Sequence, residues 1–242
     1  MILYVNGDSH SAAAEAAIHY NSAGEDPEYQ HMGRAAHPEN AKVSYAKHLA
    51  DRLGAELYLD AVSGSSNKRI IRTTREFIEA HPTEDIFVVI GWAVVSRQEV
   101  HVNDQFYCLS ANWQVTDGME SIFKEWILSY NMSPRDEALT SHHEIRQLHK
   151  FLKEKNIKHL FFNTVSLGWD EGIDLKYRIN WGNNYLNPYH SEFGYGWYLS
   201  KHGYKPKKWP NKVESGDHYG PDAHLQWAEF LLPYIRQQKT AP

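Results

Sequence analysis

Two short polar motifs, one near each end of the chain, carry residue types that can perform nucleophilic catalysis. Residues 7–10 read Gly-Asp-Ser-His and place a serine, Ser9, after a short apolar run. Residues 216–219 read Gly-Asp-His-Tyr and place His218 beside Asp217. A serine hydroxyl attacks a carbonyl carbon when a histidine removes its proton, and a carboxylate can orient the histidine ring. We therefore predict Ser9 as the nucleophile, His218 as its base and Asp217 as a candidate acid.

The position of Ser9 between an expected strand and an expected helix suits this chemistry. The apolar run Ile2–Val5 predicts a buried strand, and the alanine-rich stretch Ser11–Tyr20 predicts a helix directly after Ser9. Ligands bind at the carboxyl ends of the strands in open α/β sheets, and a helix amino terminus offers free N–H groups to an oxyanion. The competing interpretation is that Ser9 only caps this helix.

The apolar periodicity of the chain predicts an α/β fold. Strands and helices alternate over the first 92 residues, which is the pattern of right-handed βαβ units on a parallel sheet. We expect a three-layer α/β/α sandwich of the flavodoxin-like type, with a mostly parallel sheet of about five strands. Strands are expected at residues 2–5, 56–62, 85–92 and 158–165, with an edge strand or hairpin at 101–111, and helices at 41–53, 67–80, 118–130, 135–156, 192–202 and 221–237. Residues 1–242 are interpreted as one domain, with a divergent, cleft-forming region at about 93–215.

Composition and charge argue against several functional classes. The formal net charge is −5 and the sequence pI is near 6.3, which is not the electrostatic signature of a general nucleic-acid binder. No apolar run approaches the roughly 20 residues that span a bilayer. The first residues resemble a strand rather than a signal peptide, and the single cysteine, Cys108, excludes a disulfide framework within the chain. We expect a cytoplasmic or virion-associated protein. The oligomeric state does not follow from the sequence.

Several histidines invite a metal-site interpretation. His142, His143 and His149 lie in a predicted helix, with His142 and His149 about two turns apart on one face. No carboxylate or cysteine stands beside them at ligand spacing, so we interpret this region as a solvent-exposed helix face. We predict no metal and no cofactor.

The two end motifs, together with a third in the interior, resemble the signature blocks of the SGNH/GDSL hydrolases. Residues 5–9 resemble the first block, a Gly-Asp-Ser ahead of a helix, although His10 stands where the family usually has leucine. The turn at 63–67, Ser-Gly-Ser-Ser-Asn, resembles the second block, whose glycine lends a backbone N–H to the oxyanion. Residues 218–224 resemble the fifth block, a catalytic histidine before a closing helix. The blocks occur in the family order, which implies a serine esterase.

Two positions depart from the family pattern. The third block, usually Gly-x-Asn-Asp, reads Gly-Trp-Ala-Val at residues 91–94. The acid usually lies three residues before the histidine, where this chain has Ser215, so Asp217 and Glu214 are the nearby candidates. A Ser–His dyad, with a backbone carbonyl holding the ring, is the alternative. The chain is most similar to a divergent branch, common in phage-like sequences, that has a Gly-x-Ser-Asn turn and a Gly-Trp third block.

The resemblance implies an oxyanion hole and a substrate cleft. The hole would use the backbone N–H groups of Ser9 and Gly64, and Asn67 is the candidate for the missing amide donor. Trp92, Arg97 and His10 are candidate substrate contacts: Trp92 is either a platform under a sugar or a core plug, and Arg97 pairs either with Glu99 or with substrate. The aromatic, polar carboxyl-terminal loops favour a small-molecule or glycan ester, such as an O-acetyl group on a carbohydrate. The alternatives are an inactive scaffold that binds glycans or is associated with a virion, and an acyltransferase that uses the same serine.

Overall fold

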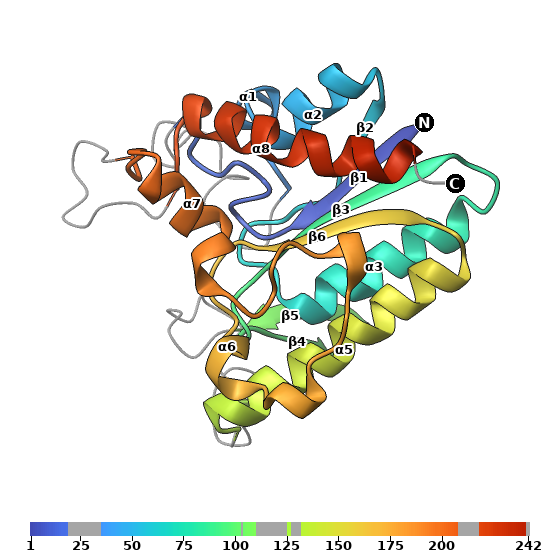
Figure 1. Ribbon diagram of the computed structural model, residues 1–242, viewed down its shortest axis with the longest axis vertical. Helices are drawn as coiled ribbons and strands as arrows, with labels where there is room; N and C mark the ends of the chain where they lie inside the picture. Colours follow the sequence, from blue (N-terminus) through green and yellow to red (C-terminus); the bar gives the residue numbers. More distant parts are fainter. Residues whose placement is uncertain (19–34, 103, 110–124, 127–131, 208–217, 241–242) are drawn as a thin grey trace.

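The structure of the protein is a computed structural model that describes residues 1–18, 35–102, 104–109, 125–126, 132–207 and 218–240 (Figure 1). Four parallel strands form its main sheet: β1 (Ile2–Gly7), β2 (Glu56–Leu59), β3 (Ile86–Trp92) and β6 (Lys158–Asn163). Their order is β2-β1-β3-β6, so the chain crosses over after each of the strands β1, β2 and β3. The fold is therefore the expected α/β class, with four strands in the main sheet where we had expected about five.

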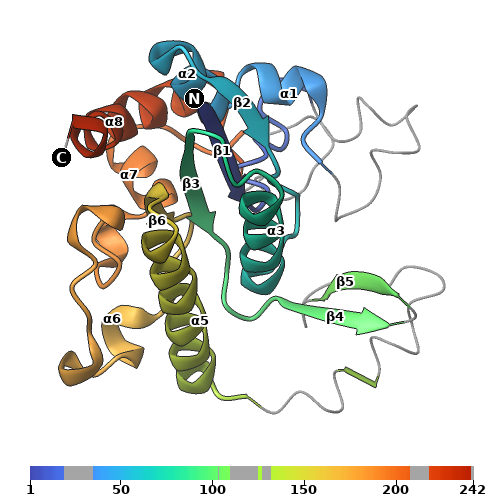
Figure 2. The same ribbon diagram turned by 90° about the vertical axis from the view of Figure 1, so that its right-hand side faces the viewer.

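Helices cover both faces of this sheet and make three layers (Figures 1 and 2). Alternate strand residues divide between two cores: Leu3 and Val5 pack with α2 and α8, whereas Tyr4 packs with α3 and α5. Every residue of β3 is buried, as is typical of an interior strand of a parallel sheet. The helices are α1 (Pro38–Lys42), α2 (Tyr45–Leu53), α3 (Asn67–Ala80), α5 (Pro134–Glu154), α6 (Trp169–Gly172), α7 (Tyr195–Lys201) and α8 (Pro221–Thr240), with single 3₁₀ turns η2 (Leu175–Tyr177), η3 (Gly182–Asn184) and η4 (Ser191–Phe193).

Local capping explains where several of these helices begin and end. The Ser66 hydroxyl accepts a hydrogen bond from the Arg69 N–H and starts α3, and Ser133 does the same for α5 within a capping box. Gly54 ends α2 in the left-handed conformation. The helix expected over 41–53 is divided into α1 and α2, because Ser44 caps a new helix at this point. Much of the helix expected at 118–130 lies outside the described residues.

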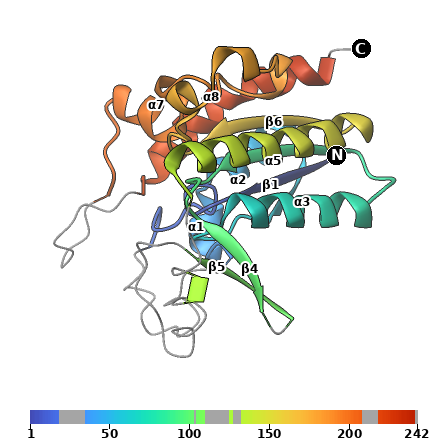
Figure 3. The same cartoon turned by 90° about the horizontal axis from the view of Figure 1, so that it is seen from below.

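The hairpin of β4 (Gln98–Val102) and β5 (Gln105–Leu109) lies apart from the main sheet (Figures 2 and 3). Its strands pair antiparallel, and Arg72 of α3 contacts both of them. The Arg72 guanidinium binds the Glu99 carboxylate at 2.7 Å and covers the Phe106 ring. The ion pair expected between Arg97 and Glu99 was therefore wrong, because Glu99 faces α3.

The helix expected over residues 11–20 is replaced by consecutive turns and bends through residue 18, the last residue described in this segment. The Ser11 side chain packs against the sheet and accepts a hydrogen bond from the Tyr45 hydroxyl at 2.8 Å. Ala13 and Glu15 take positive φ angles of 52° and 60°, which are incompatible with an α-helix. Long-range contacts of this kind outweigh the helix propensity of the alanines.

Two of the three histidines of α5, His142 and His149, face the protein interior. His142 and His149 are only 7% and 9% exposed, so the predicted solvent-exposed face was wrong for both of them. His142 Nε2 lies 2.9 Å from the Tyr189 hydroxyl, and Trp181 packs against both histidine rings. The long segment after β6 covers this face of α5, which local periodicity does not reveal. None of the helices in the described part of the chain is both long and apolar enough to cross a lipid bilayer.

Candidate active site

Ser9 follows β1 at the carboxyl edge of the sheet, where its side chain is 6% exposed. The turn is tight because Gly7 has a φ of 156°, and a Cβ there would lie 2.8 Å from the Gly91 carbonyl oxygen. The carbonyl of Ser9 accepts a hydrogen bond from the Ala14 N–H, which closes the turn that replaces the expected helix. A serine is thus held close to the main chain of the central strand, in the region where α/β folds bind ligands.

His218 is oriented by a buried carboxylate that sequence reasoning missed. Its Nδ1 lies 2.9 Å from Oε2 of Glu15, whose side chain is 6% exposed. An ionised carboxylate only accepts hydrogen bonds, so Nδ1 carries the proton and Nε2 of the neutral ring keeps a lone pair. That is the tautomer a general base requires. No hydrogen bond joins Ser9 Oγ to His218 within the described residues.

Glu15 could not be found from the sequence because the expected helix at 11–20 would have carried it away from the sheet edge. Glu15 instead has a positive φ angle, which no α-helix contains, and its carboxylate contacts His218. Asp217, the predicted acid, and Glu214 lie outside the described residues. The described part of the site therefore assigns the carboxylate–histidine contact to Glu15.

His10 joins the segment of Ser9 to the segment of His218. Its ring centroid lies 5.4 Å from that of His218 and 5.4 Å from that of Tyr195. The side chain is half-buried among these rings. A substrate contact by His10 would therefore be made beside the proposed base.

Arg97 reaches the same edge of the sheet from the loop after β3. Its Nη1 lies 3.4 Å from Oδ2 of the buried Asp8 and 3.5 Å from the Ser65 carbonyl oxygen. Oδ1 of Asp8 accepts a hydrogen bond from the His10 N–H at 3.1 Å. Arg97 thus pairs with the Asp8 carboxylate beside Ser9. It also links the turn after β1 to the turn that contains Gly64.

The predicted oxyanion donors lie on two neighbouring turns. Gly64 is buried with a φ of 79°, and within the described residues neither its N–H nor that of Ser9 donates a hydrogen bond. The Asn67 side chain is 4% exposed and makes two hydrogen bonds of 2.9 Å with the main chain of Ala93. One of its two amide hydrogens is therefore used to hold the end of β3.

Of the two interpretations of Trp92, the structure shows the second: Trp92 fills the hydrophobic core and is not available as a platform under a sugar. Its side chain is fully buried and packs edge-on against Phe161, with the ring centroids 5.1 Å apart. A fully covered indole offers no face to a sugar ring. The last residue of β3 points into the core between the sheet and α5.

Lys207 connects the two segments that carry Glu15 and His218. Its backbone N–H donates to the His218 carbonyl at 2.8 Å, and its ammonium donates to the Ala16 carbonyl. Burial lowers the pKa of this lysine. Lys207 therefore makes one hydrogen bond to the segment that carries Glu15 and one to the segment that carries His218.

His224 is a buried histidine that packs against Tyr45, and it is not the proposed base. Its ring stacks on Tyr45, and its Nδ1 accepts a hydrogen bond from the Tyr45 N–H at 3.4 Å. Burial lowers the pKa of His224 to about 3, so the ring is neutral near pH 7. Within the described residues, no group of three or more His, Cys, Asp or Glu side chains could hold a metal ion.

Comparisons with known proteins find distant likenesses. A model of a family of unknown function (DUF6071) matches residues 25–111, which is less than half of the chain. No curated protein matches the sequence. Three solved structures are similar over nearly the whole chain, at TM-scores of 0.44 to 0.47.

The first of these is a putative lipolytic protein of the G-D-S-L family from Desulfitobacterium hafniense DCB-2, at 8% identity over 96% of this chain and 98% of that one, with a TM-score of 0.46. The second is an acetyl xylan esterase from the rumen bacterium Butyrivibrio proteoclasticus, at 15% identity over 98% of this chain and 64% of that one, with a TM-score of 0.47. The third is an α/β hydrolase from the metagenome of Lake Arreo, Spain, at 12% identity over 97% and 94%, with a TM-score of 0.44. Likenesses of this degree assign no activity, so the function is argued from the site residues.

Proposed function

We propose that this protein is a serine esterase of the SGNH type, in which Ser9 is the nucleophile, His218 its base and Glu15 the carboxylate that orients His218. The observation that carries the proposal is the Glu15–His218 contact of 2.9 Å, made beside the turn of Ser9 at the carboxyl edge of the sheet. Membership of the SGNH/GDSL family, and of its divergent phage-like branch, is part of the same proposal and is supported by the motifs at 7–9, 63–67 and 218–224.

The reaction proceeds by acyl transfer. Nε2 of His218 takes the Ser9 hydroxyl proton while Oγ bonds to the ester carbonyl carbon. The carbonyl π electrons move to oxygen and form a tetrahedral oxyanion. The oxyanion collapses, His218 returns the proton to the leaving alcohol, and an acyl group remains on Ser9. Water then attacks the acyl group with the same base and releases the acid.

The proposed oxyanion hole consists of the N–H groups of Ser9 and Gly64 and the second amide hydrogen of Asn67. The two backbone donors suit this role because neither is used by another group within the described residues. Asn67 is held rigidly by its two bonds to Ala93, so its remaining N–H has a defined direction. Preorganised donors of this kind are commonly the largest single contribution to catalysis.

A small acyl group on a carbohydrate is the proposed substrate. Ser9 lies in a nearly covered position, which disfavours a long acyl chain. α7 packs on His10 through Tyr195. It presents two partly exposed aromatic rings, Phe193 just before the helix and Trp197 within it. Aromatic faces with a polar surrounding suit sugar rings. His10 and Arg97 are the proposed polar contacts.

The experiment that tests this proposal is labelling with a fluorophosphonate probe, read by intact mass on wild type and Ser9→Ala. One adduct on wild type and none on the variant is the expected result. Ser200→Ala is the control, because Ser200 is an exposed serine of α7 that should not react. A well-folded wild type without an adduct, or an adduct that persists in Ser9→Ala, would contradict the assignment.

A non-catalytic scaffold that binds glycans is the second candidate. The observation in its favour is that Ser9 Oγ and His218 share no hydrogen bond within the described residues. In ligand-free enzymes such contacts often tighten only when substrate binds. Binding of acetylated xylan fragments without turnover, together with no probe adduct, would favour the scaffold. Turnover that passes the acetyl group to an added sugar would instead favour an acyltransferase.

A further inference from the structure

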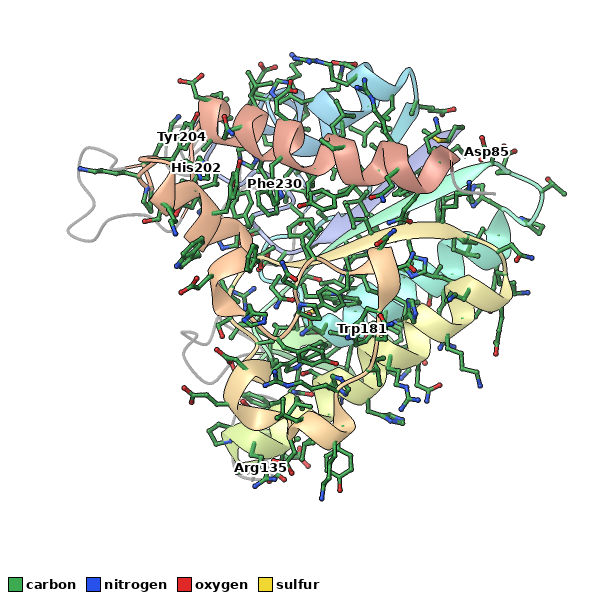
Figure 4. The ribbon with its side chains drawn as sticks, viewed as in Figure 1. Asp85, Arg135, Trp181, His202, Tyr204 and Phe230 are labelled. Atoms are coloured by element: carbon green, nitrogen blue, oxygen red, sulfur yellow. The ribbon has the colours of Figure 1, made fainter. Side chains whose placement is uncertain are left out.

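A cavity on α5 lies outside the proposed active site. It has a volume of about 490 Å³ and lies between the second half of α5 and the segment at 179–180. The carboxyl-terminal end of α5 leads directly into β6, so this half of the helix is at the edge of the sheet opposite Ser9. Trp181, labelled in Figure 4, packs against His149 beside this cavity.

The polar lining of the cavity is predominantly cationic. Arg146, Lys150 and Lys153 contribute three positive charges against one carboxylate, Glu154. Glu154 pairs with Lys150 at 3.6 Å, whereas neither Arg146 nor Lys153 pairs with a carboxylate among the described residues. The protein as a whole carries a formal charge of −5, so this cluster is not the result of a general excess of cations.

Cations near the carboxyl-terminal end of a helix interact favourably with the helix dipole, and this effect alone accounts for lysines at this position. It does not account for the histidine that lines the cavity. His149 is only 9% exposed, and its Nδ1 lies 2.8 Å from Nε2 of His159. A helix dipole does not require a buried imidazole at this position.

The hydrogen bonds of the pair define which nitrogen of each ring carries a proton. Burial lowers the pKa values of His149 and His159 to about 4 and about 3, so both rings are neutral near pH 7. Nδ1 of His159 donates to the Ile157 carbonyl at 2.9 Å, which leaves Nε2 of His159 as an acceptor. Nδ1 of His149 must therefore donate to it. Nε2 of His149 keeps a lone pair, which has no hydrogen-bond partner within the described residues.

We propose that this cavity binds a small oxyanion that also carries a hydroxyl group, with its charged oxygens on Arg146 and Lys153 and its hydroxyl donating to His149. Hydrogenphosphate and a sugar acid share this chemistry. Sulfate does not, because near pH 7 it has no proton to donate and would present an anionic oxygen to a lone pair. The proposal does not depend on the esterase assignment.

Isothermal titration calorimetry near pH 7, at constant ionic strength, tests the proposal with three probes: inorganic phosphate, glucuronate and sulfate. We expect saturable one-to-one binding of phosphate or glucuronate, with a Kd of about 1 mM or lower. Sulfate should bind at least about tenfold more weakly, because it lacks the hydrogen bond to His149 and places an anionic oxygen against its lone pair. Binding of phosphate alone indicates a site for the free inorganic ion, and binding of glucuronate alone indicates a site for a hydroxy acid. Saturation by neither, or equal binding of sulfate, overturns the proposal.

Charge-reversal variants locate the site. Lys153→Glu should weaken binding by about tenfold or more, since a charge-assisted contact becomes a repulsive one. Lys155→Glu is the matched control, because Lys155 is exposed at the end of the same helix but does not line the cavity. Equal weakening by both variants would mean that the protein attracts anions only through its overall charge. Should Lys153→Glu fail to fold, Arg146→Gln removes the other proposed cationic contact with a smaller change and should also weaken binding.

Discussion

Glu15 and His218 lie 203 residues apart in the sequence, and Oε2 of the first lies 2.9 Å from Nδ1 of the second. The contact joins the turn after β1 to the loop before α8, the two segments that carry the proposed nucleophile and base. Because Glu15 is buried, its charge acts on His218 with little screening by water. The first prediction concerns this carboxylate.

Replacing the carboxylate with an amide should impair the proposed base. Glu15→Gln retains the shape of the side chain but no longer fixes the proton on Nδ1 of His218. We expect kcat/KM for an acetyl ester to fall by about 10²- to 10⁴-fold. Steady-state kinetics on wild type and variant give this ratio.

Asp217→Asn is the control for that measurement, because Asp217 is the acid that sequence reasoning favoured. We expect it to leave kcat/KM nearly unchanged. A large loss in Asp217→Asn with little loss in Glu15→Gln would show that the adjacent aspartate orients His218.

Asn67 should contribute both to the rate of the proposed reaction and to the stability of the fold. Asn67→Ala removes a proposed oxyanion donor, which typically costs about 10²- to 10³-fold in kcat. It also leaves the N–H and C=O of Ala93 without their partners, which costs about 1–3 kcal/mol of unfolding free energy for each group left buried. Kinetics together with urea unfolding separate the two effects.

Asn67→Asp provides the comparison, because an aspartate can still accept the hydrogen bond of the Ala93 N–H. We expect it to retain part of the stability and to lose at least as much rate as Asn67→Ala, since a carboxylate repels an oxyanion. Unchanged turnover in both variants would remove Asn67 from the oxyanion hole.

Lys207 should act by positioning the segments that carry Glu15 and His218. Lys207→Met removes the ammonium contact with Ala16 and thereby loosens the segment of Glu15 relative to that of His218. We expect kcat to fall by about tenfold, because small displacements of catalytic groups are costly, with little change in KM. Lys205→Met is the control, since Lys205 is exposed nearby. A rise in KM with normal kcat would indicate a substrate contact instead.

Stability should decrease as the pH falls below about 6.5. Burial lowers the pKa of His224 to about 3, and lowers that of His159 similarly, whereas both residues titrate near 6.5 in the unfolded chain. The unfolded state then binds more protons than the folded state between these values, so the unfolding free energy rises with pH over this range. For His224 alone, the loss between about pH 7 and about pH 5 is roughly 2 kcal/mol.

Urea unfolding at several pH values measures this slope. His224→Gln should reduce the slope whatever it does to the stability itself. His143→Gln is the control, because His143 is exposed on α5 and should leave the slope unchanged. Equal slopes in wild type and His224→Gln would show that the buried ring does not control the pH dependence.

The sequence by itself determined the α/β class, the succession of strands and helices along the chain, and the positions of Ser9 and Gly64 on turns at the carboxyl ends of β1 and β2. These features follow from local rules. Apolar periodicity, capping residues such as Ser66 and helix-ending glycines such as Gly54 act over a few neighbouring residues, so they can be read along the chain.

Only the tertiary structure decided which side chains meet. Glu15 approaches His218 because Ser11, held by Tyr45, keeps an alanine-rich segment from forming a helix. Trp92 and His149 are buried because segments far along the chain pack over them. These contacts depend on the packing of residues that are distant in sequence. Local propensity contains no information about such partners, so it predicts the elements of this protein but not the acid of its proposed triad.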